Sequence, residues 1–434
     1  MIAILGVGRE TRELLGVLDR DEPGAEVLVL DERPLSPGEL PPTPRLEVDV
    51  RGGVDLDRED ALPREVDEVY RSPGISPYRP ALRRAIERGV PTTTPTGRWA
   101  RGRDGSDVIA LTGTKGKSTT AALTAHLLRA AGRRAELVGN IGRSALSAGP
   151  AADADDVVLE LSSYQLADMN ARFGLAGITT LLRDHVPWHG TVERYHRDKL
   201  RLLELSDRSV VDPQVAAHPA ATAATARSGV VTTAAHDGLR AALFEAGLVG
   251  EHLVRDAALA LALVDARLGR PAGVSDLVAS LHDFTPLPHR LAPVRVVDGV
   301  TFVDDSISTV PESAVAAVRT YLALGPVTVL LGGDDRGQDL APLVQLLRDD
   351  GVRAVLLPPL GERLHTELAP VAGDRVRRAD DLAAAVTLAA EVTPRGGAVV
   401  LSPAAPSFTS YRDFVARGEH FVALVRALVR GSPV

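Results

Sequence analysis

The chain contains no cysteine, little lysine, few aromatic residues and no long apolar run among its 434 residues. Without cysteine it can form no disulfide and no thiolate metal site, so we expect a cytoplasmic protein. No stretch approaches the ~20 uninterrupted apolar residues of a membrane span, and the N-terminus lacks the pattern of a secretory signal, so no membrane segment is expected. The net charge of −8 argues against nucleic-acid binding, although a local site can still be positive.

The scarcity of lysine makes the few lysines informative. Only three of the 49 basic residues are lysines, namely Lys115, Lys117 and Lys199. Two of them lie in the run GTKGKST at residues 113–119. A codon bias toward arginine with chance survivors is one explanation. However, a phosphate loop needs a compact ammonium group and a carbamate can form only on a primary amine, so a functional reason for Lys117 and Lys199 is favoured.

Short apolar runs alternate with helical patterns, which predicts parallel sheets covered by helices and therefore an α/β fold. A hairpin is predicted near the start of the last third, because Asp298-Gly299 separates two apolar runs. Residues 98–107 are polar and are predicted to be a linker, and the last helix is predicted at residues 411–430. Three consecutive α/β domains are expected, at residues 1–103, 104–290 and 291–434.

The run GTKGKST lies directly between a predicted strand at residues 108–112 and a predicted helix at 118–131. This context distinguishes a phosphate-binding loop from a chance glycine-rich turn, which is the alternative. Glycines let backbone N–H groups approach phosphate oxygens, and the helix N-terminus adds partial positive charge. Lys117 is expected to reach the β- and γ-phosphates and Ser118 to hold Mg²⁺. The run departs from the full GxxxxGK[ST] pattern at Leu111.

Three residues further along could complete a metal site beside this loop. Glu160 ends a predicted strand, where open α/β sheets carry ligands. His185 follows Asp184, and Lys199 lies in a helical pattern at residues 195–205. Taken singly, these are more simply a rim carboxylate, a structural histidine and an exposed lysine. Taken together, a carbamylated Lys199 would supply carboxylate-like oxygen, which Mg²⁺ accepts.

With these pieces in this order, the sequence resembles the Mur ligase family over essentially its whole length. Within the family it is most similar to members that join glutamate to UDP-N-acetylmuramoyl-L-alanine. Any one of the shared motifs is weak, but their common order is specific. They are GTKGKST, GNIG (139–142), LELSSYQL (159–166), DH (184–185), KLRLLE (199–204), LPHR (287–290), DDS (304–306), LLGGDD (330–335), LSPAAPSF (401–408) and RDF..RG..F (412–421).

The resemblance implies a three-domain fold: a Rossmann-like domain for the UDP substrate, a central P-loop ATPase domain, and a C-terminal Rossmann-like domain for glutamate. It implies an ATP-dependent ligase of peptidoglycan-precursor synthesis that forms an amide through an acyl phosphate and uses two Mg²⁺ ions. Because an acyl phosphate hydrolyses in water, closure of the domains is expected. We also expect a monomer.

The resemblance assigns residues to four sites. The catalytic residues are Lys117, Glu160, His185 and Lys199, with Ser118 and Glu160 on one Mg²⁺ and His185 and carbamylated Lys199 on the other. The ATP site comprises Gly113, Thr114, Lys115, Gly116, Lys117, Ser118, Thr119, Arg290 and Asp305. The UDP-substrate site comprises Gly8, Arg9, Asp31, Arg33, Ser72, Gly74, Asn140 and Ser162. The glutamate site comprises Thr309, Arg336, Ser407 and Phe414.

The sequence departs from the resemblance most clearly at Ile307. Members that add D-glutamate carry a lysine there, after the Asp-Ser pair. Because this chain readily uses arginine for lysine, as at Arg336, the cation at position 307 has been lost rather than exchanged. A mirror-image amino acid swaps the directions of its amine and carboxylate, so a relocated cation is expected. We therefore favour the branch that adds L-glutamate; the alternative is a D-glutamate ligase in which Ile307 is neutral drift.

Other departures and readings remain open. Leu253 and Asp256 stand where family members often have asparagine, so the adenine contacts are not assigned. Separately, Thr180 stands where asparagine is common ahead of the Asp184-His185 pair. A folylpolyglutamate synthase would lack the UDP domain, and a non-catalytic nucleotide-binding regulator would not need Lys199. A dinucleotide oxidoreductase is suggested only by the first glycine turn, whose GxGxxG pattern is broken at Thr11.

Overall fold

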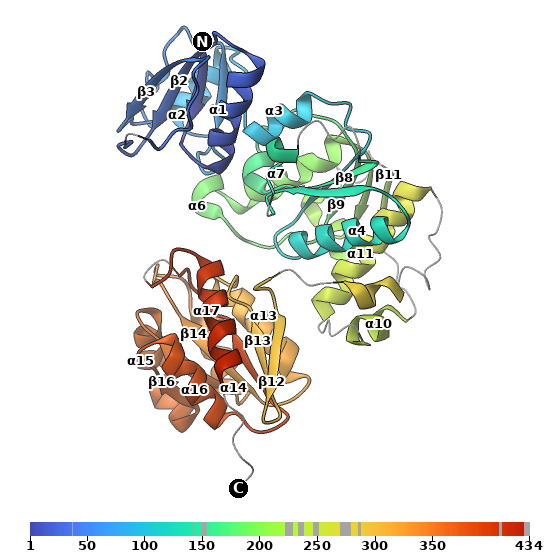
Figure 1. Cartoon of the computed structure of the whole chain (residues 1–434), viewed down its shortest axis with the longest axis vertical. Coiled ribbons are helices and arrows are strands. Elements are labelled where there is room, and N and C mark those ends of the chain that lie inside the picture. Colours follow the sequence, from blue (N-terminus) through green and yellow to red (C-terminus); the bar gives the residue numbers. More distant parts are fainter. Residues whose placement is uncertain are drawn as a thin grey trace. The chain divides into compact units, whose positions relative to one another are not determined.

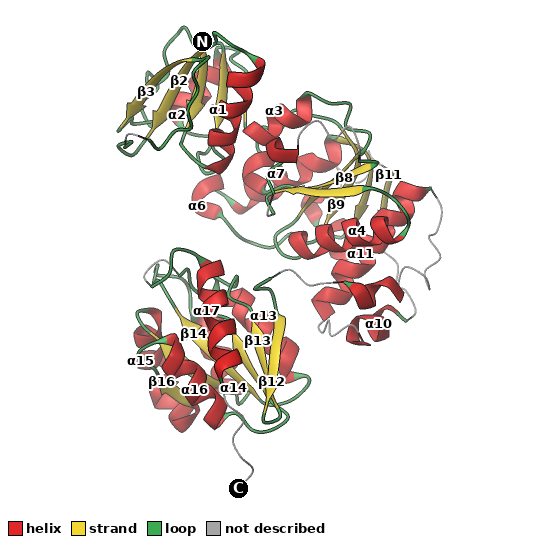
Figure 2. Cartoon of the chain, in the orientation of Figure 1, coloured by secondary structure: helices red, strands yellow, loops and turns green. Residues whose placement is uncertain are grey.

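The computed structural model describes residues 1–36, 38–141, 143–148, 154–221, 229–232, 238–245, 251–269, 279–284, 288–407 and 410–428. They form two compact units: Met1–Ala242 with His252–Phe284, and Leu243–Glu251 with Thr285–Val434. Three sheets with covering helices make up these units, which confirms the α/β class (Figures 1 and 2). The three domain boundaries stay predictions. Among the described residues no helix has both the length and the apolar character needed to cross a membrane.

The first sheet is entirely parallel, in the order β3-β2-β1-β4-β5. Successive side chains of β1 face opposite sides, so Ile4 packs in one core with Leu14 of α1 and Leu5 packs in another with Leu82 of α2. The elements are β1 (Ile2–Leu5), α1 (Arg9–Asp21), β2 (Glu26–Asp31), β3 (Glu47–Gly52), β4 (Glu68–Arg71), α2 (Pro80–Glu87), β5 (Thr92–Thr93) and α3 (Pro95–Arg101).

The expected linker at residues 98–107 was wrong in its first part, because α3 continues to Arg101. Thr94 caps this helix by accepting a hydrogen bond from the Gly97 N–H at 3.2 Å, and Pro95 occupies its first turn. A threonine cap followed by proline is a helix-start signal. Arg98 and Arg101, whose charges suggested a linker, lie within this helix.

The central sheet is also parallel, in the order β11-β10-β9-β6-β8-β7, with the fully buried β6 near its middle. Its strands are β6 (Val108–Thr112), β7 (Ala135–Gly139), β8 (Asp156–Glu160), β9 (Phe173–Ile178), β10 (Ser206–Val211) and β11 (Gly229–Thr232). Its helices are α4 (Lys117–Ala130), η1 (Leu146–Ala148), α5 (Ser163–Leu166), α6 (Val186–His189), α7 (Val192–Glu204), α8 (Pro213–Ala216), α10 (Leu239–Glu245), α11 (Glu251–Leu268) and η2 (Leu281–Asp283).

The third sheet, in the second unit, has the order β12-β13-β17-β14-β15-β16. The predicted hairpin is confirmed, since β12 and β13 pair antiparallel and Asp298 and Gly299 have φ of 49° and 80°. The remaining pairs are parallel. The elements are β12 (Ala292–Val297), β13 (Val300–Asp304), α13 (Pro311–Leu322), β14 (Val327–Gly332), α14 (Ala341–Asp349), β15 (Arg353–Leu357), α15 (Leu360–Ala372), η3 (Gly373–Arg375), β16 (Val376–Arg378), α16 (Leu382–Val392), β17 (Ala398–Leu401) and α17 (Phe414–Ala427).

The last helix begins at Phe414, not at residue 411 as predicted. The Asp413 side chain accepts a hydrogen bond from the Ala416 N–H at 2.8 Å and so caps the N-terminus of α17. Aspartate is a strong cap because it satisfies an otherwise unpaired amide of the first turn. The cap explains why the helix does not extend back to Tyr411.

A buried ion pair joins the first sheet to the central one. Arg71, at the end of β4, is fully buried, and its guanidinium contacts both carboxylate oxygens of Asp168 at 2.6 and 2.7 Å. The same guanidinium donates to the carbonyls of Tyr164 at 2.7 Å and Ile75 at 2.9 Å. Burial raises the pKa of Asp168 even though Arg71 opposes the shift. The free energy lost by removing both charges from water therefore offsets much of their Coulomb attraction. Removing one partner, however, would leave the other charge buried and unpaired.

Replacing Arg71 with methionine should lower the free energy of unfolding of the first unit by about 3–5 kcal/mol, because Asp168 would stay buried without its cation. The change can be measured from urea denaturation followed by a signal from the first unit. The double variant Arg71→Met/Asp168→Leu should recover most of the loss. Arg58→Ala, which breaks an exposed pair with Asp60, should cost about 0–1 kcal/mol. Equal effects of Arg71→Met and Arg58→Ala would contradict this account.

Candidate active site

The GTKGKST run forms a loop between β6 and the N-terminus of α4, as its sequence context predicts. Gly113 and Gly116 have φ of 152° and 85°, a backbone region that favours glycine. A Cβ on Gly116 would lie 2.2 Å from Asp256 Oδ1, and one on Gly113 would lie 1.8 Å from Thr179 Oγ1. Only glycine therefore fits at these two positions. The loop presents backbone amides and the positive end of α4, an arrangement suited to phosphate.

Thr179 and Thr180, which directly follow β9, form hydrogen bonds to the loop. Thr114 N donates to Thr180 O at 2.8 Å, and Lys115 N donates to Thr180 Oγ1 at 2.9 Å. The hydroxyls of Thr179 and Thr180 both donate to the Lys115 carbonyl. These bonds order the loop before any ligand arrives. Thr180, which the sequence marked only as a departure from the family, thus has a defined structural role.

Lys199 lies against this loop although it is 86 residues from Gly113 in the chain. Its side chain is 2% exposed, and its Nζ donates to the Gly113 carbonyl at 2.7 Å. The Tyr195 ring covers the ammonium group at 4.9 Å, and the Tyr195 hydroxyl donates to Thr114 Oγ1 at 3.0 Å. Burial, with Lys117 as the next cause, lowers the pKa of Lys199 well below its usual range. The site therefore favours a neutral, nucleophilic amine.

Glu160 ends β8 at the same edge of the sheet and is 1% exposed. Its Oε1 accepts a hydrogen bond from Asn140 Nδ2 at 3.2 Å, and Asn140 N donates to the Glu160 carbonyl at 2.9 Å. Its Oε2 is buried and accepts no hydrogen bond from the described residues. A buried carboxylate oxygen without a donor fits a cation or a cation-bound group. Within the described ranges no cluster of three or more His, Asp or Glu could enclose a metal alone.

His185 faces the loop from a left-handed backbone conformation with φ of 51°. Its Nδ1 lies 3.1 Å from the Tyr164 hydroxyl. The neighbouring Asp184 carboxylate lies 3.8 Å from Lys115 Nζ. Burial lowers the pKa of His185, and the nearby lysines act in the same direction. A neutral imidazole is the form that can bind a metal ion.

In the first domain, Asp31 joins the two loops expected to bind the UDP substrate. Its Oδ2 accepts from Val7 N at 2.8 Å and its Oδ1 accepts from Arg33 N at 3.0 Å. The Arg33 guanidinium forms an ion pair with Glu39 at 2.6 Å, which lowers the pKa of Glu39 to about 2. Thr11, which breaks the GxGxxG pattern, closes the glycine turn instead: its hydroxyl donates to the Gly6 carbonyl at 2.8 Å.

The remaining residues expected at the UDP-substrate site lie around these loops. Arg9 is exposed at the start of α1, and a Cβ on Gly8 would lie 3.2 Å from Ser72 Oγ. The carbonyl of Gly74 accepts from Trp188 Nε1 of the central domain at 2.9 Å. Ser162 caps α5 by accepting from Gln165 N at 3.2 Å. The structure thus gathers these residues on loops and helix starts, while their contact with substrate stays a prediction.

The residues expected to bind glutamate and to meet the nucleotide from the C-terminal domain all belong to the second unit. Asp305 is 3% exposed; its Oδ2 accepts from Ser402 Oγ at 2.7 Å and from Ser308 Oγ. Burial raises the pKa of Asp305 to about 6. Arg290 is the cation whose charge opposes that shift. The ATP-binding roles of Arg290 and Asp305 stay predictions.

Of the predicted glutamate residues, Thr309, Arg336 and Ser407 lie on the loops after β13, β14 and β17, and Phe414 begins α17. Arg336 is exposed, with its guanidinium 3.9 Å from the Asp334 carboxylate. Phe414 lies beside His289, with ring centroids 6.2 Å apart. Thr309 is half-buried and Ser407 is buried.

A buried arginine that sequence reasoning missed holds two of these loops together. Arg417 donates to the carbonyls of Ser306 at 2.8 Å and Ala405 at 3.1 Å, and burial lowers its pKa to about 10. Its place in the RG motif was a signal that it mattered. Other motif residues, Gly142, Leu287 and Phe408, lie outside the described residues.

Comparison with known proteins agrees with this geometry. Residues 111–246 match the Mur ligase middle domain. A UDP-N-acetylmuramoyl-L-alanine--L-glutamate ligase of Xanthomonas euvesicatoria pv. vesicatoria is 40% identical over 388 residues, covering 82% of this chain and 81% of that protein. The chain belongs to the Mur ligase family. A protein of the same name from Salinispora tropica is 35% identical over 450 residues, covering 98% of this Mur ligase and 97% of its own length.

Solved structures of other Mur ligases share the fold of this one. The MurF ligase of Thermotoga maritima, in complex with ADP, has a TM-score of 0.56 at 14% identity and covers 97% of this chain and 93% of its own. The folylpolyglutamate synthase of Mycobacterium tuberculosis, complexed with ADP, has a TM-score of 0.55 at 19% identity. The matched region spans 92% of the synthase chain but only 76% of this Mur ligase. The fold of that synthase therefore leaves about a quarter of this chain unmatched.

Proposed function

We propose that this Mur ligase joins L-glutamate to UDP-N-acetylmuramoyl-L-alanine in peptidoglycan-precursor synthesis, with ATP converted to ADP and phosphate. The relatives that carry this name match up to 98% of the chain. The observation that carries the proposal is the buried Lys199 amine, bonded to the Gly113 carbonyl of the phosphate loop. A protein that only binds a nucleotide has no need of a primary amine buried at that point. ADP in the structurally similar ligase of Thermotoga maritima supports the use of ATP.

The residues of the loop suit transfer of the γ-phosphoryl group to a carboxylate. One oxygen of the alanine carboxylate forms a bond to the γ-phosphorus, the bond to the β,γ-bridging oxygen breaks, and ADP leaves. Lys117 and the amides of the loop are placed to neutralise charge on the transferred group. The glutamate amine then attacks the acyl carbon, loses a proton to water, and phosphate leaves with the bond to carbon broken. Lys117 and the helix N-terminus stabilise oxyanion charge in both steps.

The residues also fit Mg²⁺, which prefers oxygen ligands and commonly takes one or two carboxylates together with phosphate oxygens. Glu160 offers its buried Oε2, and Ser118 lies in the first turn of α4. Bound there, the ion would neutralise phosphate charge. His185 and Lys199 are the proposed ligands of a second ion. Within the described part of the chain these groups need oxygens from the nucleotide to complete a cation site.

Carbamylation of Lys199 is part of this proposal. A carbamate forms when a neutral amine attacks CO₂ and loses a proton. Burial lowers the pKa of Lys199, which supplies the neutral amine that the reaction needs. The product would place an anion near His185 and so provide an oxygen ligand. Labelling with ¹³C-bicarbonate should give a carbamate resonance that is absent from Lys199→Arg.

The choice of L-glutamate over D-glutamate rests on two observations. The names of both relatives specify L-glutamate. Ile307, where members adding D-glutamate carry lysine, is half-buried and its N–H donates to the His289 carbonyl at 3.1 Å. No cation therefore stands at that point, and Arg336 is the residue proposed to pair with a glutamate carboxylate. The runner-up is a D-glutamate ligase with a neutral change at position 307.

The purified enzyme should release ADP only when ATP, UDP-N-acetylmuramoyl-L-alanine and glutamate are all present, and L-glutamate should be preferred at least ~100-fold over D-glutamate in kcat/KM. The expected size follows from a site whose polar groups pair with only one arrangement of amine and carboxylates. A coupled ADP assay with each isomer measures it. Preference for D-glutamate would establish the runner-up. ATP turnover that ignores the nucleotide sugar would reject both.

The proposal places the enzyme in the cytoplasm, where ATP and UDP-linked precursors are available, and takes it to be a monomer with no nucleic-acid partner. Its partners are then the two small substrates and ATP. Light scattering of the purified chain would test the oligomeric state directly.

A further inference from the structure

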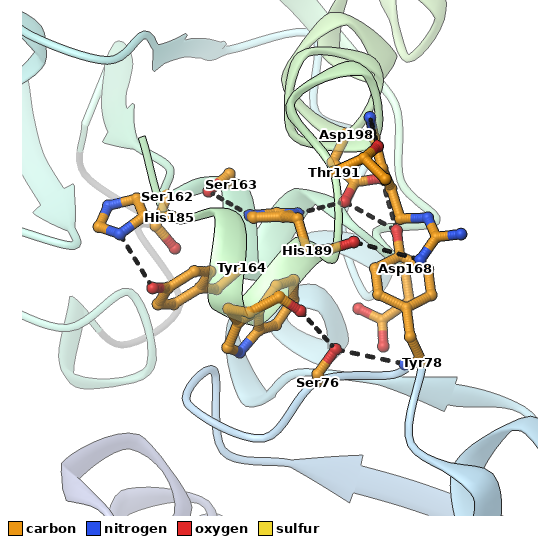
Figure 3. Close-up of polar contacts among 12 residues, drawn as sticks. Ser76, Tyr78, Ser162, Ser163, Tyr164, Asp168, His185, His189, Thr191 and Asp198 are labelled. Atoms are coloured by element: carbon orange, nitrogen blue, oxygen red, sulfur yellow. Dashed lines mark hydrogen bonds and ion pairs between the residues drawn. The ribbon is translucent and has the colours of Figure 1, made fainter. Parts of the chain in front are cut away.

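A chain of hydrogen bonds links the first domain to the helix that carries Lys199 (Figure 3). Ser163 Oγ lies 3.0 Å from His189 Nε2, and His189 Nδ1 lies 2.7 Å from Asp198 Oδ2. The hydroxyl of Tyr78, from the first domain, lies 2.7 Å from both oxygens of the Asp198 carboxylate. The side chains of Ser163, His189 and Asp198 are buried at 2%, 0% and 3% exposure. Both imidazole nitrogens are thus engaged inside the protein.

The order Ser163–His189–Asp198 is the order of a hydrolase triad, but burial excludes that chemistry here. A nucleophile must reach a substrate carbonyl, with a site about 3 Å away that an oxyanion can occupy. Ser163 lies in the first turn of α5, enclosed by the protein, and its hydroxyl is already bonded to His189. The three side chains can therefore influence the reaction only through the groups that they hold.

Ser163, His189 and Asp198 lie in three segments that also carry residues of the candidate active site. Ser163 follows Ser162 and begins α5 on the turn after Glu160. Asp198 immediately precedes Lys199 on α7. His189 ends the short helix α6, which starts directly after His185. One imidazole ring therefore ties together the three segments that carry Glu160, His185 and Lys199.

The first domain contacts the same segments beside Tyr78. Ser76 Oγ donates to the Trp188 carbonyl at 3.1 Å, and Trp188 Nε1 donates to the Gly74 carbonyl at 2.9 Å. Trp188 also stacks on Tyr164, whose hydroxyl lies 3.1 Å from His185 Nδ1. The loop of residues 74–78 begins at Gly74, which the resemblance to Mur ligases assigns to the UDP-substrate site. It is thereby connected through Trp188 and Asp198 to both His185 and Lys199.

We infer that His189 is a positioning residue for the phosphate site. We also infer that Tyr78, through Asp198, couples the position of the first domain to the position of the Lys199 side chain. The inference rests on the proposed function, because it takes the UDP substrate as the ligand of the first domain. Polar networks buried in a low dielectric hold their members in one arrangement, since any other leaves a group unpaired. A substrate that orders the 74–78 loop should therefore favour the arrangement of Lys199 that binds the nucleotide, and the effect must be reciprocal.

Calorimetry of ATP binding with Mg²⁺, with and without UDP-N-acetylmuramoyl-L-alanine, tests the coupling. In the unmodified enzyme the nucleotide sugar should lower the Kd for ATP about 5- to 100-fold. Tyr78→Phe keeps the ring against Trp188 but removes the hydroxyl. In this variant the nucleotide sugar should change the Kd for ATP by no more than about twofold. Tyr70→Phe is the matched control: Tyr70 is also a first-domain tyrosine, but its hydroxyl accepts from Arg98 and does not join this chain. It should keep the full coupling.

His189→Gln tests the positioning role separately. Loss of an outer partner of metal-binding groups commonly costs 10- to 100-fold, so kcat should fall about that much while the Kd for the nucleotide sugar stays within about threefold. A fall in kcat with an unchanged Kd separates misplacement of reacting groups from loss of folding.

The outcomes distinguish the inference from the proposed function. Coupling that survives in Tyr78→Phe, or that is absent from the unmodified enzyme although both ligands bind, would overturn the coupling. Unchanged kcat in His189→Gln would overturn the positioning role. Failure of the unmodified enzyme to bind the nucleotide sugar at all would instead reject the proposed function, and the inference with it.

Discussion

Replacing Lys199 with arginine should reduce ligase turnover by at least ~10³-fold while the Kd for ATP changes by no more than about threefold. Electrostatic contacts made in the transition state commonly carry effects of this size. Arginine keeps a positive charge but, unlike the primary amine of lysine, cannot form a carbamate. Turnover is measured as ADP release with both substrates, and ATP binding by calorimetry.

The control for Lys199→Arg lies on the same helix. Arg197 is exposed on α7, two residues before Lys199, so Arg197→Lys makes the reverse exchange at a solvated position and should leave turnover unchanged. Full activity in Lys199→Arg would show that turnover needs no carbamate and would overturn the proposed carbamylation of Lys199. Loss of ATP binding along with turnover would instead indicate damage to the loop, because Lys199 contacts Gly113 directly.

Replacing Lys117 with alanine should lower kcat by about 10²–10³-fold, with a much smaller change in KM for the nucleotide sugar. Lys117 is the first residue of α4, and its Nζ lies 3.2 Å from the Thr114 carbonyl across the loop. From there it would face phosphates bound by the loop amides, as the proposed function requires. Its charge is needed most when negative charge builds on the transferred group, so the loss should appear in kcat.

The neighbouring lysine supplies the comparison for Lys117→Ala. Lys115 is in the same loop, but its side chain is 41% exposed and its ammonium lies 3.8 Å from the Asp184 carboxylate. Charges screened by water contribute less, so Lys115→Ala should reduce kcat by only about tenfold or less. Similar losses in the two variants would mean that the general positive potential of the loop, and not a placed ammonium, drives the reaction.

Local patterns were enough to predict the parts of the site that are contiguous in the chain. The phosphate loop, the strand before it and the helix after it were all predicted within a residue of their observed bounds. The reason is that glycine, β-branched and capping residues act through the backbone of their own segment. Errors arose where two local signals competed, as at α3, where a threonine cap and a proline outweighed the charges that suggested a linker.

Contacts between distant segments could not be predicted in this way. Arg71 and Asp168 are 97 residues apart, and Tyr78 and Asp198 are 120 residues apart, yet each pair is hydrogen-bonded. Nothing in the periodicity of either segment identifies its partner. The position of Asp198 directly before Lys199 is the sequence signal that could have drawn attention to it.

By itself, the sequence determined that this protein is a cysteine-free α/β ligase of the Mur family with a glycine-rich loop at residues 113–119 between a strand and a helix, because motif order and glycine placement are properties of the chain. Only the tertiary structure decided that Lys199 is buried against Gly113, that Glu160 keeps a carboxylate oxygen without a donor, and that Tyr78 reaches the helix of Lys199. Burial and long-range pairing depend on which faces pack together, and that choice is made by the whole fold.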